Sequence, residues 1–379
     1  MTNSAFRFDR RWSIRATPLV LALVLGGCKT WPDKPDTPPV SASQARTLIG
    51  TLLPSGIKDR DGWTADIYAG FAAMELHPSA DNICSVIAVT AQESGFADDP
   101  QVPGLSKIAW REIEDRAKRF HIPISVVRTA LRVPSPGGKS FAARIDEART
   151  EAELSSIYED LISFLPLGKS LLSNRNPVRT GGPMQVSISF AQTHAEQYPY
   201  PYPLDHSLRR EVFTRRGGMY FGIAHLLQYP ANYEQVIFRY ADFNAGRYAS
   251  RNAAFQNAVT LTSGIPLEMD GDLIRYGSSS RNTSPGATEL ASRVLAKRLS
   301  MRESEIRRDL EKGLSLDFES SELYEKVFDL ADEQEDIRVP RAIIPDIKLK
   351  SPKITRNLTT KWFAERVASR HKACMKRVQ

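Results

Sequence analysis

The sequence predicts a mainly α-helical protein, on three observations. Stretches such as IAWREIEDRAKRF and ARTEAELSSIYEDLISFL repeat apolar residues at the spacing of one helix face. Turn-forming residues punctuate these stretches, as in the Pro134–Gly138 turn and the loop at 277–286. Strand-like alternation is confined to 337–354, which holds three prolines and is expected to be an extended surface segment. No sheet larger than a hairpin or two is therefore expected.

The helical signals follow one another through most of the chain. The first ordered helix is expected near Ser43, in SASQARTLIGTLL. A second covers 81–94, capped by Ser79 or Asp81 and ended by Gly95. Further helical periodicity covers 104–135, 139–166, 207–229, 232–245, 287–313, 319–336 and 358–377.

The composition is that of a globular protein with one large domain or two smaller ones. Hydrophobic residues make up 41% and charged residues 25% of the 379 residues. The net charge is +7, and removal of the four N-terminal arginines and Asp9 leaves about +4. This surplus does not indicate a nucleic-acid partner, whereas it suits an anionic polymer such as the cell wall.

The N-terminus has the organisation of a secretory signal. Four arginines precede the apolar run 19–25, and Gly26, Gly27 and Cys28 follow it. The run is shorter than the roughly 20 residues of a membrane-spanning helix. Leu25-Gly26-Gly27-Cys28 resembles the bacterial lipobox, whose cysteine is diacylated; the alternative is an ordinary signal peptide with a chance cysteine. Lys29, in place of the aspartate of inner-membrane lipoproteins, favours the periplasmic face of the outer membrane.

These features divide the N-terminal part of the chain. We expect a signal peptide at 1–27 and a lipidated Cys28 with a Pro-rich tether at 28–43, which would attach the protein to a membrane. Cys84 and Cys374 remain. They are expected either to form a disulfide in the oxidising periplasm or to stay as two buried thiols.

Signatures of metal and cofactor sites are missing from the sequence. The six histidines form neither HExxH nor a Cys/His cluster, and no GxSxG, P-loop or GxGxxG occurs. We therefore expect no metal and no cofactor.

Glu93 is the first candidate for chemistry. It follows Val86 by seven residues and Val89 by four, so the carboxyl shares their helix face. Burial and the negative end of the helix dipole would both raise its pKa, as a general acid requires. The alternative is a side chain that turns into solvent past Gly95.

Three short motifs give Glu93 a context. They are Glu93-Ser94 in AQESGF, Gly182-Pro-Met-Gln185 in GGPMQVS, and Asp242-Phe-Asn-Ala-Gly246 in YADFNAG. In this order they resemble the Glu-Ser, Gly-Leu-Met-Gln and Ala-Tyr-Asn-Ala-Gly motifs of the soluble lytic transglycosylase family. The resemblance implies a lysozyme-like fold and cleavage of peptidoglycan glycan strands.

The resemblance also assigns roles by position. Glu93 would be the single catalytic acid and base. Substrate-binding roles would fall to Ser94, Met184, Gln185, Asn244, Ala245, Gly246 and, in a looser match of 268–276 to a Glu-Thr-Arg-x-Tyr segment, Tyr276. In the implied mechanism, Glu93 protonates the oxygen between N-acetylmuramic acid and N-acetylglucosamine. It then takes the proton of the muramoyl 6-hydroxyl, which closes a 1,6-anhydro ring without water.

The chain departs from the family pattern in several places. Pro183 replaces leucine, Asp242-Phe243 replaces Ala-Tyr, and a helical insertion at about 100–180 separates the first two motifs. The implied architecture is a catalytic domain at 44–280 that contains this insertion, with a helical C-terminal extension at 281–379 packed on it.

Other interpretations of the sequence stay open. Asp98, Asp99 or Asp242 could supply a second carboxylate, which would make the protein a lysozyme-like hydrolase. It could instead be a non-catalytic peptidoglycan-binding lipoprotein, or an envelope assembly factor whose inserted or C-terminal helices bind a partner protein. The segment Tyr198–Pro203 either edges a glycan groove with exposed rings or forms a rigid loop with partly buried tyrosines.

Overall fold

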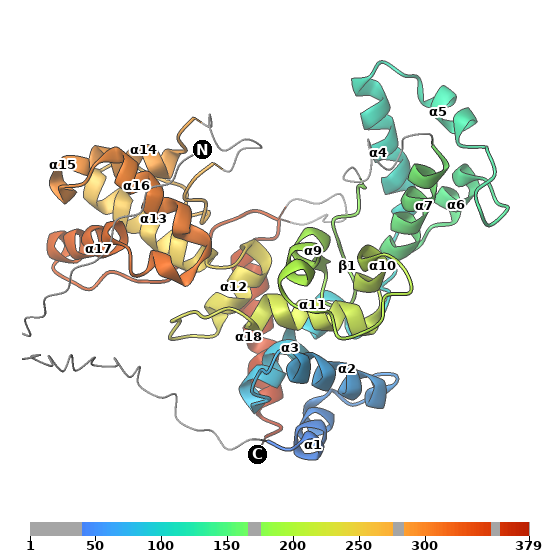
Figure 1. Ribbon diagram of the computed structural model, residues 1–379, viewed down its shortest axis with the longest axis horizontal. Coiled ribbons are helices and arrows are strands. Elements are labelled where there is room, and N and C mark those ends of the chain that lie inside the picture. The colour runs from blue at the N-terminus through green and yellow to red at the C-terminus, as the bar shows by residue number, and fades with distance from the viewer. Residues whose placement is uncertain (1–39, 166–175, 276–283, 350–356, 379) are drawn as a thin grey trace, which may run out of the picture. The chain divides into compact units, whose positions relative to one another are not determined.

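A computed structural model describes residues 40–165, 176–275, 284–349 and 357–378 (Figure 1). The mainly α-helical class is confirmed. In the N-terminal half the helices are α1 (Ala42–Leu52), α2 (Arg60–Ala73), α3 (Ala80–Glu93), α4 (Leu105–Arg119), α5 (Ile124–Ala130), α6 (Phe141–Glu147), α7 (Glu151–Phe164) and α9 (Ile188–Gln197). The strands β1 (Thr180–Gly181) and β2 (Val186–Ser187) form an antiparallel pair.

The C-terminal half is helical throughout most of its described length. Its elements are α10 (Leu208–Val212), α11 (Arg215–Leu227), α12 (Ile237–Ala245), α13 (Ala249–Ser263), α14 (Ala287–Val294), α15 (Ala296–Leu299), α16 (Glu303–Leu310), the 3₁₀ turns η2 (Glu311–Leu314) and η3 (Leu316–Phe318), α17 (Glu322–Glu335) and α18 (Thr360–Met375). The segment expected to be extended, 337–354, has no helix in its described part.

Three hydrophobic clusters organise the packing between residues 40 and 378. The first joins α1, α2, α3, α11, α12 and α18; the second joins α13 to α17; the third is small and lies among α4, α6 and α7. Figure 1 shows these groups as the blue, yellow-green and red core, the orange group and the teal insertion. The clusters cut across the division expected near residue 280, since α13 packs with the second cluster and α18 with the first.

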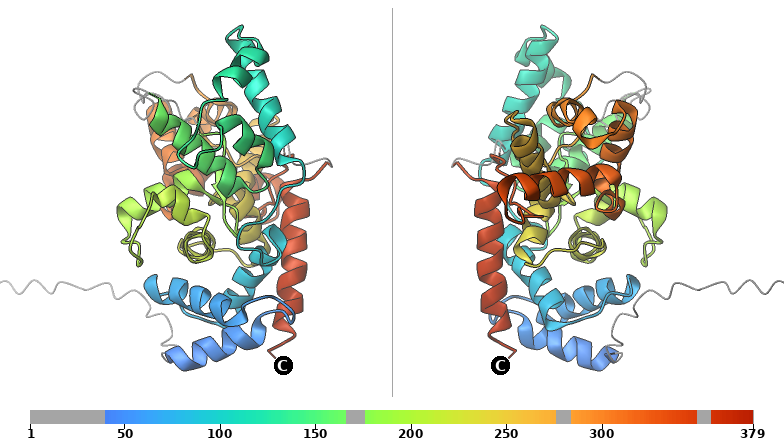
Figure 2. Two further views of the ribbon diagram at one scale, coloured as in Figure 1. Left: turned by 90° about the vertical axis from the view of Figure 1, so that its right-hand side faces the viewer. Right: turned by 90° about the vertical axis from the view of Figure 1, so that its left-hand side faces the viewer.

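The last helix closes the first cluster. α18 runs beside α3 and also packs on α12 (Figure 2). Phe363, Ala364 and Val367 bury one of its faces, and a disulfide joins Cys374 to Cys84 on α3. The basic residues of α18 therefore occupy the outer face of a helix that supports the core.

Local sequence explains most helix boundaries. Ser41 and Thr150 form capping boxes with Gln44 and Glu153 at the starts of α1 and α7, which satisfies backbone N–H groups there. The ranges expected from periodicity omit α2, α9 and α13. α13 is buried on nearly every side, polar residues such as Arg251 and Gln256 included, so it shows no single apolar stripe.

Several expectations concern residues outside the described ranges. The signal peptide, Cys28, most of the tether and Tyr276 all lie there. Within the described ranges, no helix has the length and apolar character needed to cross a membrane.

Candidate active site

Helix α11 brings the three sequence motifs together. Thr214 caps its start by accepting a hydrogen bond from the backbone N–H of Gly217. Most of its residues are buried in the first hydrophobic cluster. In Figure 1 it lies between α3, the β1 region and α12. We call the three motifs gathered along it, 93–94, 182–185 and 242–246, the motif cluster.

The first motif ends helix α3 next to the N-terminal half of α11. The Thr90 hydroxyl, one turn before Glu93, lies 3.8 Å from the Met219 sulfur on α11. Val86 and Val89 are fully buried, and Glu93 is half-buried as the last residue of the helix. The Ser94 hydroxyl donates to the Thr90 carbonyl at 3.2 Å. Glu93 thus sits at the rim of the first cluster, where a buried helix meets solvent.

A sharp turn follows Glu93. Gly95 and Phe96 both have left-handed backbone conformations, with φ of 60° and 66°. For phenylalanine this conformation is uncommon and needs support from its surroundings. The edge of the Phe96 ring packs on Trp63 of α2, with ring centroids 5.1 Å apart. This contact fixes the path of the chain directly after Glu93.

The second motif lies directly on the middle of α11. A Cβ on Gly218 would overlap the Pro183 ring, and one on Gly222 would lie 2.7 Å from the Met184 Cβ. The two glycines therefore allow the 182–185 turn to touch the helix backbone. Met184 is fully buried in this contact. The expectation that Met184 binds substrate is corrected, because its side chain packs against Gly222 of α11 and is closed off from solvent.

Gln185 closes the same turn. Its backbone is left-handed, with φ of 49°, and its N–H donates to the Gly182 carbonyl at 3.0 Å. Its side-chain oxygen accepts from the Thr180 hydroxyl at 3.1 Å. The half-buried amide is therefore held between the two short strands.

The third motif ends α12 near the C-terminal half of α11. The His225 ring lies 5.0 Å from the Phe243 ring, and its Nε2 lies 3.2 Å from the Phe243 carbonyl oxygen. Asn244, Ala245 and Gly246 are half-buried. The Asn244 side-chain oxygen accepts from the hydroxyl of Thr360, the first residue of α18, at 3.1 Å. The C-terminal helix thus contacts the helices of both the first and the third motif.

Asp242 has a structural role. It is fully buried and its oxygens accept from the hydroxyls of Tyr229 and Tyr233 at 3.1 and 2.6 Å. They also accept from the backbone N–H of Tyr248 at 3.0 Å and of Ser250 at 2.7 Å. These bonds fix the turn between α12 and α13. The expectation that Asp242 supplies a second catalytic carboxylate is corrected, because a ligand in solvent has no access to it.

Carboxylates gather around Arg215 beside the exit of α3. Its guanidinium donates to Asp66 at 2.5 Å and to Asp59 at 2.6 Å, and Asp98 lies 4.0 Å away. The bond from Arg215 holds the pKa of Asp59 below its usual range, whereas burial raises the pKa of Asp98. Asp99 is exposed, and burial raises its pKa as well. Asp98 and Asp99 remain the candidates for a second carboxylate.

The Tyr-Pro segment is partly buried and partly open. The Tyr200 hydroxyl donates to Glu211 at 2.6 Å and its ring stacks on Phe221. Tyr198 is 45% exposed and stacks on His194. The Tyr202 ring is half-buried, with the Arg216 guanidinium 5.1 Å from its centroid, and burial raises the pKa of its hydroxyl. The segment therefore matches the interpretation as a rigid loop with partly buried tyrosines. Tyr198 is the ring that stays exposed.

Two histidines, the buried His194 and the half-buried His225, flank the cluster. Burial lowers the pKa of His225 to about 4 and also lowers that of His194. The Nδ1 atom of each ring is buried without a hydrogen-bond partner in the part of the chain that the structure describes. No group of three or more His, Cys, Asp or Glu residues suited to a metal ion occurs in that part. Both rings pack against aromatic side chains, His194 on Tyr198 and His225 on Phe243.

The residues that hold the motif-bearing helices in place were not predicted from the sequence. Arg247 donates to the Ala224 and His225 carbonyls and so caps the end of α11. Arg215, His225 and Thr360 were not singled out either. The signal that could have indicated α11 is its set of small residues, Gly217, Gly218 and Gly222, which suits close contact with another segment.

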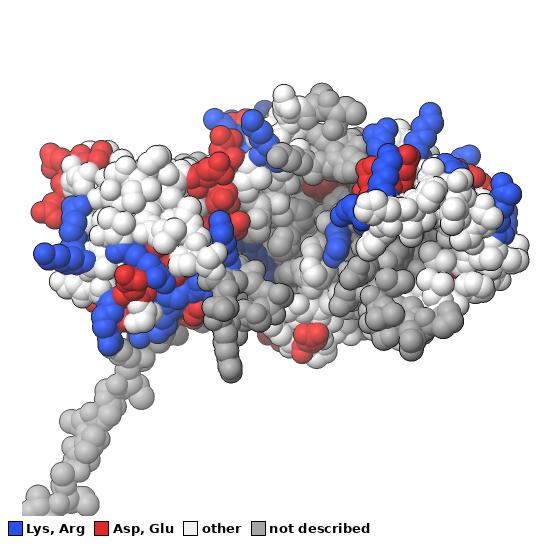
Figure 3. Space-filling view, turned by 90° about the horizontal axis from the view of Figure 1, so that it is seen from above, with Lys and Arg blue, Asp and Glu red and all other residues white. Residues whose placement is uncertain are grey.

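Charge on the surface is mixed. On the face in Figure 3, the coloured Lys/Arg and Asp/Glu side chains are interspersed, without a single-sign field over the described part of that face. Both signs of charge therefore lie side by side on this face.

Similarity to known proteins extends over most of the chain. The model of the family described as "Protein of unknown function (DUF1615)" matches residues 56–377. The chain is 53% identical over 358 residues to "Uncharacterized protein YaiW" of Escherichia coli (strain K12), an alignment that covers 94% of this chain and 97% of that protein. No solved structure gives a significant match.

Proposed function

The chain belongs to the DUF1615 family, and we propose that it is a membrane-anchored lytic transglycosylase of peptidoglycan. One observation carries the proposal: the three motifs converge on one helix, α11, although 88 residues separate Glu93 from Gly182 and 56 separate Gln185 from Asp242. Their order along the chain is that of the transglycosylase motifs. Convergence of this kind is what a shared substrate site requires. The lysozyme-like core, Glu93 and the lipid anchor on Cys28 belong to the same proposal.

The position of Glu93 suits a general acid. Its helix is buried up to Thr90 and ends at Glu93, so the carboxyl lies between apolar packing and the solvent-facing turn at Gly95. A general acid in this position has to hold its proton until the glycosidic bond breaks. Asn244, held by one side-chain hydrogen bond, and Gln185, held by two, would face the sugar from the other two motifs.

The proposed reaction balances with one carboxyl group. Glu93 donates its proton to the glycosidic oxygen as the bond from that oxygen to muramoyl C1 breaks. The resulting carboxylate takes the proton of the muramoyl 6-hydroxyl as its oxygen bonds to C1. The products are a free N-acetylglucosamine 4-hydroxyl and a 1,6-anhydro end, and Glu93 is again protonated.

The anchor sets where this reaction would occur. A tether of about 15 residues between Cys28 and the first helix spans at most roughly 50 Å. The enzyme would therefore cut glycan close to the outer membrane, on its periplasmic face.

Product chemistry tests the reaction. The purified full-length protein is incubated in detergent with isolated sacculi, and the released muropeptides are weighed by mass spectrometry. We expect anhydro-muramoyl ends, which are lighter than the hydrolysed ends by the mass of one water. Reducing ends would instead indicate a hydrolase that uses Asp98 or Asp99. Absence of any release would favour a binding or assembly role and would contradict the proposal.

A further inference from the structure

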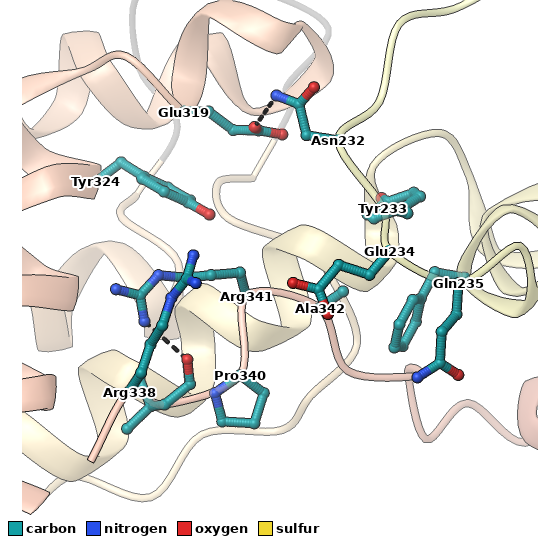
Figure 4. A pocket seen from close by; sticks show the side chains of 12 residues that line it. Asn232, Tyr233, Glu234, Gln235, Glu319, Tyr324, Arg338, Pro340, Arg341 and Ala342 are labelled. Atoms are coloured by element: carbon teal, nitrogen blue, oxygen red, sulfur yellow. Dashed lines mark hydrogen bonds between the residues drawn. The ribbon is translucent and has the colours of Figure 1, made fainter.

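A second candidate site lies beside the start of α12, outside the motif cluster. It is a cavity of about 510 Å³, bounded by residues 232–235 and Phe238 on one side and by Glu319, Tyr324 and residues 338–342 on the other (Figure 4). A volume of this size is typical of small-molecule sites.

One end of the cavity carries an arginine without an ion pair among the described residues. Arg341 donates to both oxygens of Asp332, at 2.9 and 2.7 Å, and to the Val339 carbonyl at 2.7 Å, so its charge is offset. Arg338 is exposed, and no hydrogen bond or ion pair joins it to another residue of the described ranges. Burial raises the pKa of the nearby Tyr324 hydroxyl to about 12, although the charges of Arg341 and Arg338 act to lower it. The phenol therefore stays protonated.

The facing side carries acceptors. Glu319 accepts from the Asn232 amide at 2.8 Å and lies 3.8 Å from the buried guanidinium of Arg251. Glu234 is exposed, and the described residues offer it neither a hydrogen bond nor an ion pair. Figure 4 shows its side chain extending toward Arg341 across the cavity. The cavity therefore presents an unpaired cation and an unpaired anion to one ligand.

This pair of charges selects the class of ligand. A neutral sugar would hydrogen-bond to both groups but would neutralise neither charge. A nucleotide would match Arg338 but would bring phosphate toward Glu234. A short peptide carries both a carboxylate and N–H groups. We propose that the cavity binds a short peptide, with a peptide carboxylate on Arg338 and peptide N–H or ammonium groups on Glu234.

The position of the cavity relates it to the motif cluster. Phe238 lines the cavity and Asn244 lies six residues later on the same helix, about 9 Å along its axis. An extended tetrapeptide spans about 13 Å. Resting on the proposed function, we infer that the occupant is the stem peptide of a glycan strand held at the motif cluster.

Binding of a defined stem peptide tests this inference without catalysis. The probe is the tetrapeptide L-Ala-γ-D-Glu-meso-diaminopimelate-D-Ala, titrated calorimetrically into the full-length protein. Arg338→Gln and Glu234→Gln should each weaken binding about tenfold or more, because charge-assisted hydrogen bonds are lost. The matched control Arg111→Gln, at an exposed arginine of α4, should bind as the unaltered protein does.

The outcomes separate this inference from the proposed function. Glu93→Gln should bind the tetrapeptide unchanged, even if sacculi are never cleaved. No binding by the unaltered protein, or equal binding by Arg338→Gln and the Arg111→Gln control, would overturn the peptide site. Anhydro products accompanied by absent peptide binding would leave the transglycosylase proposal intact and remove only this inference.

Discussion

The motif cluster and the 232–342 cavity use their polar groups in opposite ways. In the motif cluster, Asp242 accepts four hydrogen bonds, Asn244 is held by Thr360 and the Ser94 hydroxyl is bonded to its own helix. In the cavity, Arg338 and Glu234 have no such partner among the described residues. The first region is built to fix geometry, whereas the second keeps charge available for a ligand. Substitutions in the two regions should therefore act on different observables.

The largest effect is expected at Asp242. Each of its oxygens accepts a backbone N–H, from Tyr248 or from Ser250, so in Asp242→Asn the new NH₂ group would face one of these donors whichever way the amide is turned. We expect a loss of about 3 kcal/mol in unfolding free energy, because a buried donor is left unsatisfied. Denaturant unfolding checks this, with exposed Asp205→Asn as the control. Equal stability of the two variants would contradict the role of Asp242 in fixing the turn.

A smaller effect is expected at Gly222. The new Cβ in Gly222→Ala would lie 2.7 Å from the Met184 Cβ, so the 182–185 turn must move off α11. Overpacking of this kind costs about 2 kcal/mol. In Gly50→Ala on α1, the nearest atom is 3.9 Å away, and this control should be neutral or slightly stabilising. Thermal unfolding of both variants measures the difference, and a stable Gly222→Ala protein would show that the turn is not held by close contact.

The smallest effect concerns pH. The pKa of His225 is about 4 in the folded protein, whereas the ordinary value for a histidine in an unfolded chain is 6.5. The unfolded state therefore binds more protons between these values, and the neutral buried ring contributes stability that is complete above pH 6.5 and is lost as the pH falls toward 4. Between pH 7 and pH 5.5 the expected loss is about 1 kcal/mol.

His225→Gln isolates this contribution. The pKa of His194 is also lowered by burial, so the variant should keep part of the pH dependence and lose the share of His225. Unfolding free energies of the variant and the unaltered protein at the two pH values provide the test. The same pH slope in both proteins would contradict the assignment.

The sequence predicted the helices that carry one apolar face and the residues that form the motifs. Periodicity found α4, α7 and α17, because each packs one side on a core. The capping residue and Gly95 indicated α3, in which residues 83–90 are all buried. Periodicity did not find α13, which is buried on nearly every side. Only the possible Cys84–Cys374 disulfide, and not the periodicity, indicated that α18 lies against α3.

The sequence indicated only some of the residues of the candidate site. Glu93 could be placed on an apolar face by counting residues, and Cys84 and Cys374 could be named as a candidate pair. The burial of Asp242 and Met184 depends on α11 and on residues 229, 233, 248 and 250, which are distant in sequence or carry no motif. The cavity could not be predicted from the sequence, because its lining residues Arg338, Glu234 and Tyr324 come from three segments with no shared pattern.

The central claim is that Glu93 carries the chemistry of the motif cluster. Its most direct test is the rate at which anhydro-muropeptides appear from sacculi with Glu93→Gln, compared with Glu196→Gln on α9. The first variant should lose at least about a thousandfold in rate, since the proton donor is removed, and the second should match the unaltered protein. Undiminished release of anhydro products by Glu93→Gln would contradict this claim.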